Sequence, residues 1–180
     1  MSQTELSYEE TRQKIIDALY KHSIGVLSTS ANDIVTSREV RLVYDGLTIY
    51  CYTDLDSRKF KQISANHNVA VSVSTIQIEG VASIIGHPAE PNNTKFLELY
   101  KEQQPQMYEI SYNEYLAEGK RPETRLISII PKRIALYLSG AVAVSAGYTF
   151  VGCLDILNIE KQQAYRVGAY EFKDSLAYYD

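Results

Sequence analysis

The stretch from Val35 to Phe60 decides the fold, and it reads VTSREVRLVYDGLTIYCYTDLDSRKF. Residues 35–43 and 47–52 predict two strands, because β-branched and aromatic side chains are frequent in both. Tyr44-Asp45-Gly46 predicts a tight turn between them, so the two strands are expected to pair as an antiparallel hairpin. Ser57 is a favourable N-cap residue, and a helix is expected to begin directly after it. The stretch therefore predicts a strand pair that leads into the start of a helix.

The flanking sequence extends this hairpin into a mainly β protein with peripheral helices. Further helices are expected over 8–22, 94–103 and 111–116, and further strands over 24–28, 69–74, 81–85, 124–130, 134–138 and 142–151. Pro131 is expected to separate two of these strands, because proline cannot donate to a sheet. Six or more strands joined by short turns predict an antiparallel barrel, which leaves few open edges. No repeat or linker divides the chain, so residues 1–180 are expected to form one domain.

The composition excludes several classes of protein. The chain has 180 residues, is 45% hydrophobic and carries a net charge of -4, which suits a globular domain and offers no overall basic field for nucleic acid. No run approaches the roughly 20 apolar residues of a membrane helix, and no secretory signal is expected at the start. Cys51 and Cys153 lack the spacing of a disulfide framework or a zinc site. We therefore expect a cytoplasmic protein without a metal, a membrane partner or a nucleic-acid partner.

Two cations lie where a helix ordinarily disfavours them. Arg58 and Lys59 fall in the first turn of the expected helix, whose dipole makes a cation unfavourable by about 0.3–1 kcal/mol. A bound anion would reverse this effect, since helix N–H groups, the Ser57 hydroxyl, a guanidinium and an ammonium together suit a phosphate monoester. Arg38 and Arg41, on the preceding strand, are further candidate ligands. The spacing therefore favours a local anion site.

A plainer interpretation of the same residues stays open at this point. Asp54 and Asp56 adjoin Arg58 and Lys59 in the sequence, and such clusters are often solvated surface pairs that contribute little energy. The charge pattern alone does not separate an anion site from surface ion pairing.

The same stretch contains four motifs in a defined order. They are Ser37-Arg38-Glu39-Val40-Arg41-Leu42, Asp45-Gly46, Ile49-Tyr50-Cys51-Tyr52-Thr53 and Ser57-Arg58-Lys59. Together they closely resemble the pyridoxamine 5'-phosphate oxidase family of FMN-binding split barrels. The resemblance covers about residues 8–138 and leaves 139–180 as a C-terminal extension. It implies a six-stranded antiparallel split β-barrel, mainly β with peripheral helices.

The resemblance also implies a cofactor, FMN, and the residues that hold it. The implied phosphate ligands are Arg38, Ser57, Arg58 and Lys59, and the implied flavin contacts are Val40, Tyr52, Thr53 and, from a partner subunit, Tyr137. Because the family builds its site between two subunits, a homodimer is implied as well. The implied activity is that of an FMN-dependent oxidoreductase acting on an unidentified small organic substrate, with NADH or NADPH as a candidate reductant. No catalytic side chain is identified, as expected where the cofactor performs the redox step.

Departures from the family pattern narrow the expected activity. Val43 stands where the true oxidases have a lysine, and no arginine lies between Arg58 and Arg121, where they carry one for the substrate phosphate. The chain also has no tryptophan. We therefore expect a retained flavin phosphate site and a lost pyridoxamine phosphate site. A non-catalytic module that holds flavin or haem, and a deazaflavin-dependent reductase, stay open as alternatives.

Overall fold

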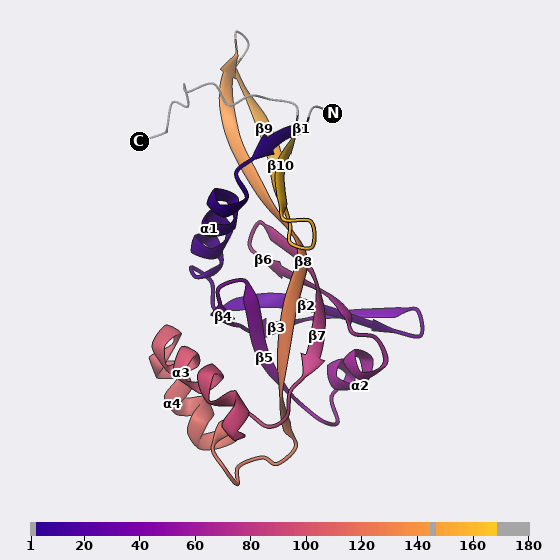
Figure 1. Ribbon diagram of the computed structural model, residues 1–180, viewed down its shortest axis with the longest axis vertical. Coiled ribbons are helices and arrows are strands. Elements are labelled where there is room, and N and C mark those ends of the chain that lie inside the picture. The colour runs from indigo at the N-terminus through magenta and orange to yellow at the C-terminus, as the bar shows by residue number, and fades with distance from the viewer. Residues whose placement is uncertain (1–2, 145–146, 169–180) are drawn as a thin grey trace.

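A computed structural model describes residues 3–144 and 147–168 of the chain (Figure 1). The strands are β1 (Gln3–Leu6), β2 (Ile24–Ala31), β3 (Ile34–Arg41), β4 (Val43–Asp45), β5 (Thr48–Asp54), β6 (Asn68–Val73), β7 (Ile76–Ile84), β8 (Thr124–Val144), β9 (Gly147–Asn158) and β10 (Gln163–Gly168). The helices are α1 (Tyr8–Leu19), α2 (Arg58–Ala65), α3 (Thr94–Gln103) and α4 (Pro105–Ser111), with short helical turns η1 (Pro91–Asn93) and η2 (Tyr112–Leu116). The predicted class, a mainly antiparallel β protein with peripheral helices, is confirmed.

Six long strands form the barrel part of the sheet. Pairing runs in the order β3, β2, β6, β7 and β8, and β5 then pairs with the first half of β8. Short β4 pairs with β5, whereas β3 pairs with β2, so the predicted hairpin of residues 35–43 with 47–52 forms only over β4. Because β9, β10 and β1 extend the same sheet, the described residues contain ten strands, within the expected six or more.

Strand β8 joins the barrel to the C-terminal extension, and it does so without a break at Pro131. The prediction of two strands separated by this proline is wrong. The register with β7 shifts between Glu79 and Gly80, so that Gly80 faces Pro131 and Glu79 faces Arg133. Such a bulge leaves one residue outside the hydrogen-bond ladder, so the strand can continue although proline has no N–H to donate. Gly80 is needed there, because a Cβ would lie 2.8 Å from the Ile130 carbonyl oxygen.

The extension is an antiparallel ribbon that α1 holds against the barrel. β8 and β9 pair from Arg133 to Val144, and β10 and β1 follow on the other edge of β9. Part of the predicted strand over 142–151 falls on residues 145–146, which lie outside the described residues. β1 escaped prediction because it is only four residues long and its first three residues are polar, and it exists through pairing with β10.

Strand β5 separates two hydrophobic cores. Ile49 and Cys51 belong to the barrel core, which also takes in Ile15 and Leu19 from α1. The alternate residues of β5 pack on the other face, against a second core built by α3, η2 and β8 from Phe96, Tyr100, Leu116 and Leu126. Alternation along one strand therefore decides whether a side chain faces the barrel or the helices.

None of the helices in the described part of the chain is both long and apolar enough to cross a membrane.

Candidate functional site

The site predicted from the sequence lies where β5 ends and α2 begins. Ser57 caps α2, and its Oγ accepts a hydrogen bond from the Phe60 N–H at 3.2 Å. The Thr53 Oγ1 lies 2.6 Å from the same Ser57 oxygen. The cap has the local geometry expected of Ser at this position, since it satisfies a helix N–H that has no intrahelical partner. Thr53 and Ser57 are therefore brought together as the sequence predicted.

The cations that follow the cap have no acidic partner in the residues the structure describes. The first turn of α2 contains Arg58 and Lys59 and no acid. The ion pairs of residues 3–144 and 147–168 include neither of these two side chains nor Arg38. Asp54 instead accepts a hydrogen bond from the Thr124 hydroxyl. Among the described residues, Arg58 and Lys59 therefore do not form the surface ion pairs that the plainer interpretation expects.

Arg38 brings a third positive charge to this point from β3. Its guanidinium donates to the Leu27 carbonyl at 3.0 Å and to the Thr29 Oγ1 at 2.7 Å. Burial lowers the pKa of Arg38, and the nearby charge of Arg58 lowers it further. Like charges repel, so a cluster of this kind favours a bound anion over an empty site. Arg38, Arg58 and Lys59 are hereafter called the cation cluster.

Cys51 lies beneath the cation cluster as an inert core residue. Burial raises the pKa of its thiol to about 12, although the charges of Lys59 and Arg38 act in the opposite direction. The thiol is therefore protonated and hidden, and it is unsuited to act as a nucleophile. Cys51 is therefore a small residue of the barrel core.

Three further predicted residues do not join the cluster through their side chains. Val40 follows Arg38 on the same face of β3 and is part of the barrel core. Tyr52 points to the other face of β5, where its hydroxyl lies 3.3 Å from the Ser111 Oγ. Tyr137, 44% exposed on β8, lies over Gly152, where a Cβ would collide with its ring. In a single chain, the Tyr137 side chain therefore packs on the described part of the C-terminal extension.

Arg41 belongs to a different environment from the one the sequence suggested. Its guanidinium donates to the Gln104 Oε1 at 2.9 Å, on the helical side of the barrel. Arg38 and Arg41 are separated by three positions, an odd number, so they lie on opposite faces of β3. Arg41 therefore does not belong to the cation cluster.

Sequence reasoning missed the polar residues that surround Arg38. Gln62 of α2 is 5% exposed, and its Oε1 accepts from the hydroxyls of Thr29 and Thr36, both at 2.6 Å. A glutamine beside Ile63 on the buried side of a short helix was the available signal. Its partners could not be named, because they come from β2 and β3.

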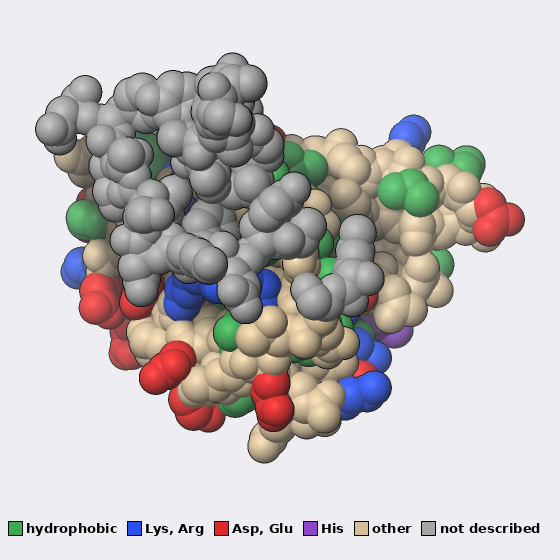
Figure 2. Space-filling model, turned by 90° about the horizontal axis from the view of Figure 1, so that it is seen from above, with side chains coloured by type: hydrophobic (Ala, Val, Ile, Leu, Met, Phe, Trp, Pro, Cys, Tyr) green, Lys and Arg blue, Asp and Glu red, His purple; other side chains and the backbone are tan. Residues whose placement is uncertain are grey.

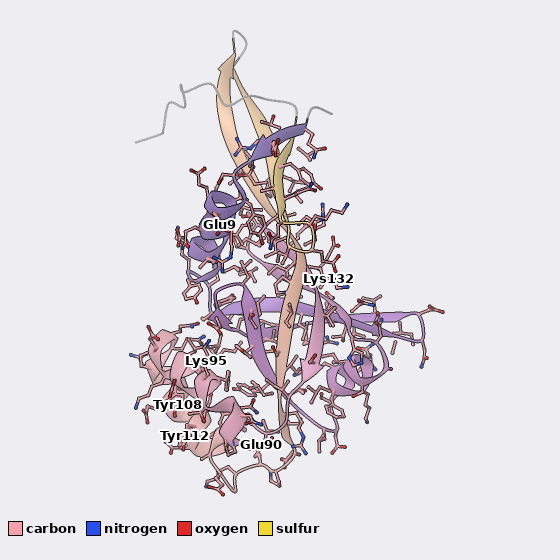
Figure 3. All side chains as sticks on the ribbon, viewed as in Figure 1. Glu9, Glu90, Lys95, Tyr108, Tyr112 and Lys132 are labelled. Carbon is pink, nitrogen blue, oxygen red and sulfur yellow. The ribbon has the colours of Figure 1, made fainter. Side chains whose placement is uncertain are left out.

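Several of the tyrosines gather on the helical side, away from the cation cluster. Figure 3 labels Tyr108 and Tyr112, whose rings stack with centroids 5.2 Å apart. Tyr100 meets the Tyr108 ring edge-on, and its hydroxyl lies 3.0 Å from the Ser111 Oγ. Burial raises the pKa of Tyr100 to about 12. These rings join α3, α4 and η2 to one another and account for part of the high tyrosine content, 15 residues in the chain.

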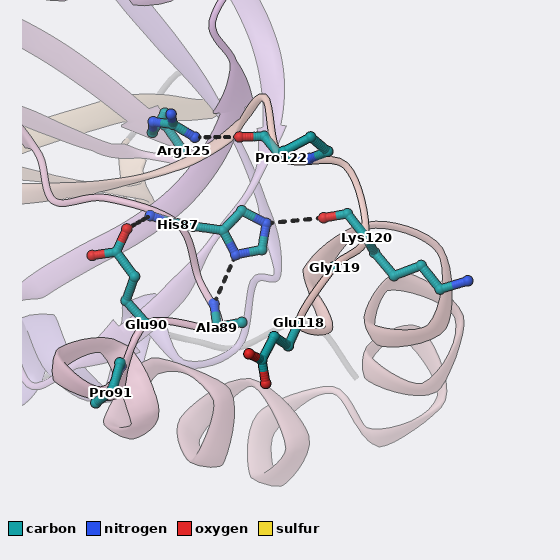
Figure 4. Close-up of a pocket in the computed structure, with 9 residues that line it drawn as sticks. All are labelled: His87, Ala89, Glu90, Pro91, Glu118, Gly119, Lys120, Pro122 and Arg125. Carbon is teal, nitrogen blue, oxygen red and sulfur yellow. Dashed lines mark hydrogen bonds between the residues drawn. The ribbon is translucent and has the colours of Figure 1, made fainter.

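A separate cavity of about 390 Å³ lies between two loops at the start of β8 (Figure 4). The His87 Nδ1 accepts from the Ala89 N–H, so the Nε2 carries the proton and donates to the Lys120 carbonyl at 3.1 Å. Arg125, which also lines the cavity, donates to the Pro122 carbonyl. None of the residues predicted for the FMN site lines this cavity. In the described residues, no group of three metal-ligating side chains is present here or elsewhere.

Comparison with known proteins places this geometry in a family. Residues 11–137 match the family described as pyridoxamine 5'-phosphate oxidase. The chain belongs to this family. The matched segment includes β2 to β7, α2 and the whole cation cluster, and it ends at Tyr137, just before the C-terminal extension.

Individual relatives agree with this membership. General stress protein 26 of Bacillus subtilis (strain 168) is 33% identical over 66 residues, a match that covers 37% of this chain and 47% of that protein, about half its length. The structure of the General Stress Protein 26 from Bacillus anthracis str. Sterne is 26% identical, with a TM-score of 0.52, and the match covers 72% of this chain and 92% of that one. HutZ, the heme storage protein from Vibrio cholerae, is 12% identical with a TM-score of 0.51, covering 71% and 90% of the two chains, which shows the fold alone.

Proposed function

We propose that this protein is an FMN-dependent oxidoreductase whose cofactor phosphate lies at the cation cluster. The observation that carries the proposal is the convergence of Arg38, Arg58 and Lys59 at the capped start of α2, without a carboxylate partner in the described residues. A phosphate monoester supplies the missing negative charge, and it accepts hydrogen bonds from side chains and helix N–H groups.

The donor set fits this cofactor. Arg58 and Lys59 would contact the phosphate directly. The Ser57 and Thr53 hydroxyls share one hydrogen bond, so one of them would donate to the phosphate or to the ribityl chain. Val40 and the backbone at Tyr52 would lie beside the flavin ring. When bound, FMN supplies two-electron redox chemistry, while the chain's own residues bind, orient and shield it. This division of roles explains why no catalytic side chain stands out.

We also propose a homodimer in which Tyr137 of one subunit approaches the flavin of the other. Figure 2 shows hydrophobic side chains on the arm that projects to the right, which is the β2–β3 hairpin of Figure 1. Ile34 and Val35 at its tip are 60% and 66% exposed, and Ile24 and Val26 on β2 are also exposed. A second subunit would cover such residues. Light scattering should give about twice the chain mass of 20.4 kDa, and a monomer at micromolar concentration would contradict the dimer.

The substrate proposed for this site is a small organic molecule other than pyridoxamine 5'-phosphate. Val43, which stands where the true oxidases have lysine, is buried in the second core with Phe96 and Tyr100. No cation at that position can therefore hold a second phosphate. A buried charge without its partner loses about 2–5 kcal/mol of binding, so turnover of pyridoxine 5'-phosphate should be negligible with added FMN. Efficient turnover would contradict this assignment.

The absorption spectrum of the purified protein tests the proposed function. Oxidised flavin bands that bleach with NADH or NADPH are expected. Flavin bands without turnover of any reductant would favour a binding module, and a Soret band would favour haem. Tight binding of a deazaflavin in preference to FMN would favour a deazaflavin-dependent reductase. Both cysteines are free and buried, which suits the reducing cytoplasm that we propose as its location.

A further inference from the structure

Gln62 is the centre of a buried polar network that joins α2 to β2 and β3. Its Oε1 accepts from the Thr29 and Thr36 hydroxyls, both at 2.6 Å, and from the Arg38 Nη2 at 3.4 Å. Its Nε2 donates to the Ile34 carbonyl at 2.9 Å. A side chain with all these partners has one defined position, and so do the groups that depend on it.

The proton directions in this network follow from the chemistry of its members. Arg38 can only donate, so it donates to the Thr29 Oγ1 and the Thr36 Oγ1. Each hydroxyl has a single proton, which then goes to the Gln62 Oε1. The glutamine oxygen therefore turns both hydroxyls so that their lone pairs face the guanidinium. Without that acceptor, either hydroxyl could rotate and present its proton side to Arg38.

The acceptors around Arg38 are all neutral. The Nη1 donates to the Leu27 carbonyl and to Thr29, and the Nη2 donates to Thr36 and Gln62. These bonds hold the guanidinium without cancelling its charge. The Nε has no acceptor among the described residues, so its N–H is available to an anion. An acid in place of Gln62 would accept the same hydrogen bonds, but it would neutralise Arg38 from within.

We propose that Gln62 is the positioning residue that makes the cation cluster selective for a phosphate. It orients Arg38 through Thr29 and Thr36, and because it is uncharged it leaves the cluster's positive charge to the ligand. The inference rests on the proposed FMN function and deepens it: the recognised group is a phosphate monoester, and a flavin without a phosphate gains nothing from Gln62.

The test compares FMN with riboflavin, which lacks the phosphate, in fluorescence titrations of the wild type, Gln62→Glu and Lys61→Gln. Both variants lower the net charge by one unit on α2, but Lys61 is exposed and has no part in the network. Gln62→Glu should weaken FMN binding by at least about tenfold, the loss of one charge-assisted interaction, with riboflavin affinity unchanged. Lys61→Gln should change neither affinity more than about twofold. An unchanged FMN affinity in Gln62→Glu would overturn the inference.

Two further measurements test the role of Gln62 if the first variant does not fold or the wild type binds no flavin. If Gln62→Glu does not fold, Gln62→Met removes the acceptor without adding a charge, and it should reduce the preference for FMN over riboflavin; a wild-type preference would overturn the inference. If the wild type binds neither flavin, the proposed function fails, and inorganic phosphate then becomes the probe. Phosphate that raises the melting temperature of the wild type but not of Gln62→Glu would support the role of Gln62, and equal shifts or no shift would overturn it.

Discussion

Two clusters of charged side chains in this molecule differ in whether their cations have an acidic partner. Asp155, on β9, is 1% exposed and receives hydrogen bonds from Arg166 of β10 at 2.6 and 3.0 Å and from Lys14 of α1 at 2.8 Å. The cation cluster at the start of α2 has three positive charges and no acid in the described residues. The first cluster has its acidic partner within the chain, whereas we propose that a ligand supplies the negative charge for the second.

The comparison separates a structural role from a binding role for the same kinds of residue. The Asp155 cluster holds α1 against the extension, and its charges serve stability. In the cation cluster, neutral acceptors hold Arg38, so that its charge remains available. A cation that keeps its hydrogen bonds but lacks a counter-charge is therefore the feature that indicates an anion site in this fold.

The largest expected effect is on stability, from removing the acid of the Asp155 cluster. Asp155→Ala removes the buried carboxylate and leaves Arg166 and Lys14 without a counter-charge. This should cost about 3–5 kcal/mol in the free energy of unfolding, measured with urea. As a control, Glu79→Ala breaks an exposed pair with Arg133 and should cost less than about 1 kcal/mol. Equal losses in the two variants would mean that the Asp155 cluster does not stabilise the fold.

The next largest effect is on FMN binding, from removing a charge of the cation cluster. Arg58→Ala should weaken FMN binding by about 1.5–3 kcal/mol, roughly tenfold to a hundredfold, because a charge-assisted hydrogen bond to the phosphate is lost. The stability of the FMN-free protein should hardly change, since the substitution also removes a repulsion with Arg38. Lys61→Ala, on the exposed side of the same helix, is the matched control and should bind FMN as the wild type does. A loss of stability with unchanged FMN affinity would show that Arg58 has a structural role, as Arg166 has in the Asp155 cluster.

The smallest expected effect is the pH dependence of the Asp155 contribution. Burial would raise the pKa of this carboxyl, but the hydrogen bonds from Arg166 and Lys14 outweigh burial and hold it below the ordinary value of 3.8. A carboxyl with a lowered pKa stabilises the folded state above its ordinary pKa and loses that contribution as the pH falls. The difference in unfolding free energy between the wild type and Asp155→Asn should therefore be constant near neutral pH and shrink below about pH 4. A difference that grew on acidification would show that the sign is wrong.

The barrel could be predicted from the sequence because its strands carry their own pattern. Val69, Val71 and Val73 alternate with exposed residues, and β6 is found where this alternation predicts it. Strand β7 begins at Ile76, before the predicted start at Val81, because Gln77, Glu79 and Gly80 made its first half resemble a turn. The continuity of β8 through Pro131 depends on a bulge in the pairing with β7, and single-strand patterns do not contain such pairing.

The site was predictable to the extent that its residues adjoin each other in the sequence. Ser57, Arg58 and Lys59 form one motif at one helix start, and a local pattern finds them. Gln62 meets Thr29 across 33 positions of sequence, through the docking of α2 on β2, so its role follows from tertiary structure alone. The Tyr52 side chain is the opposite case: alternation along β5 with buried Cys51 would have placed it on the helical side.

A crystal structure of the protein with FMN tests the central claim most directly. The account predicts two subunits, with the FMN phosphate within hydrogen-bond distance of the Arg58 and Lys59 head groups and the Ser57 hydroxyl, and with the Gln62 network intact beside Arg38. A phosphate bound instead in the cavity lined by His87 and Arg125, with the cation cluster paired to an acidic side chain of the second subunit, would contradict it.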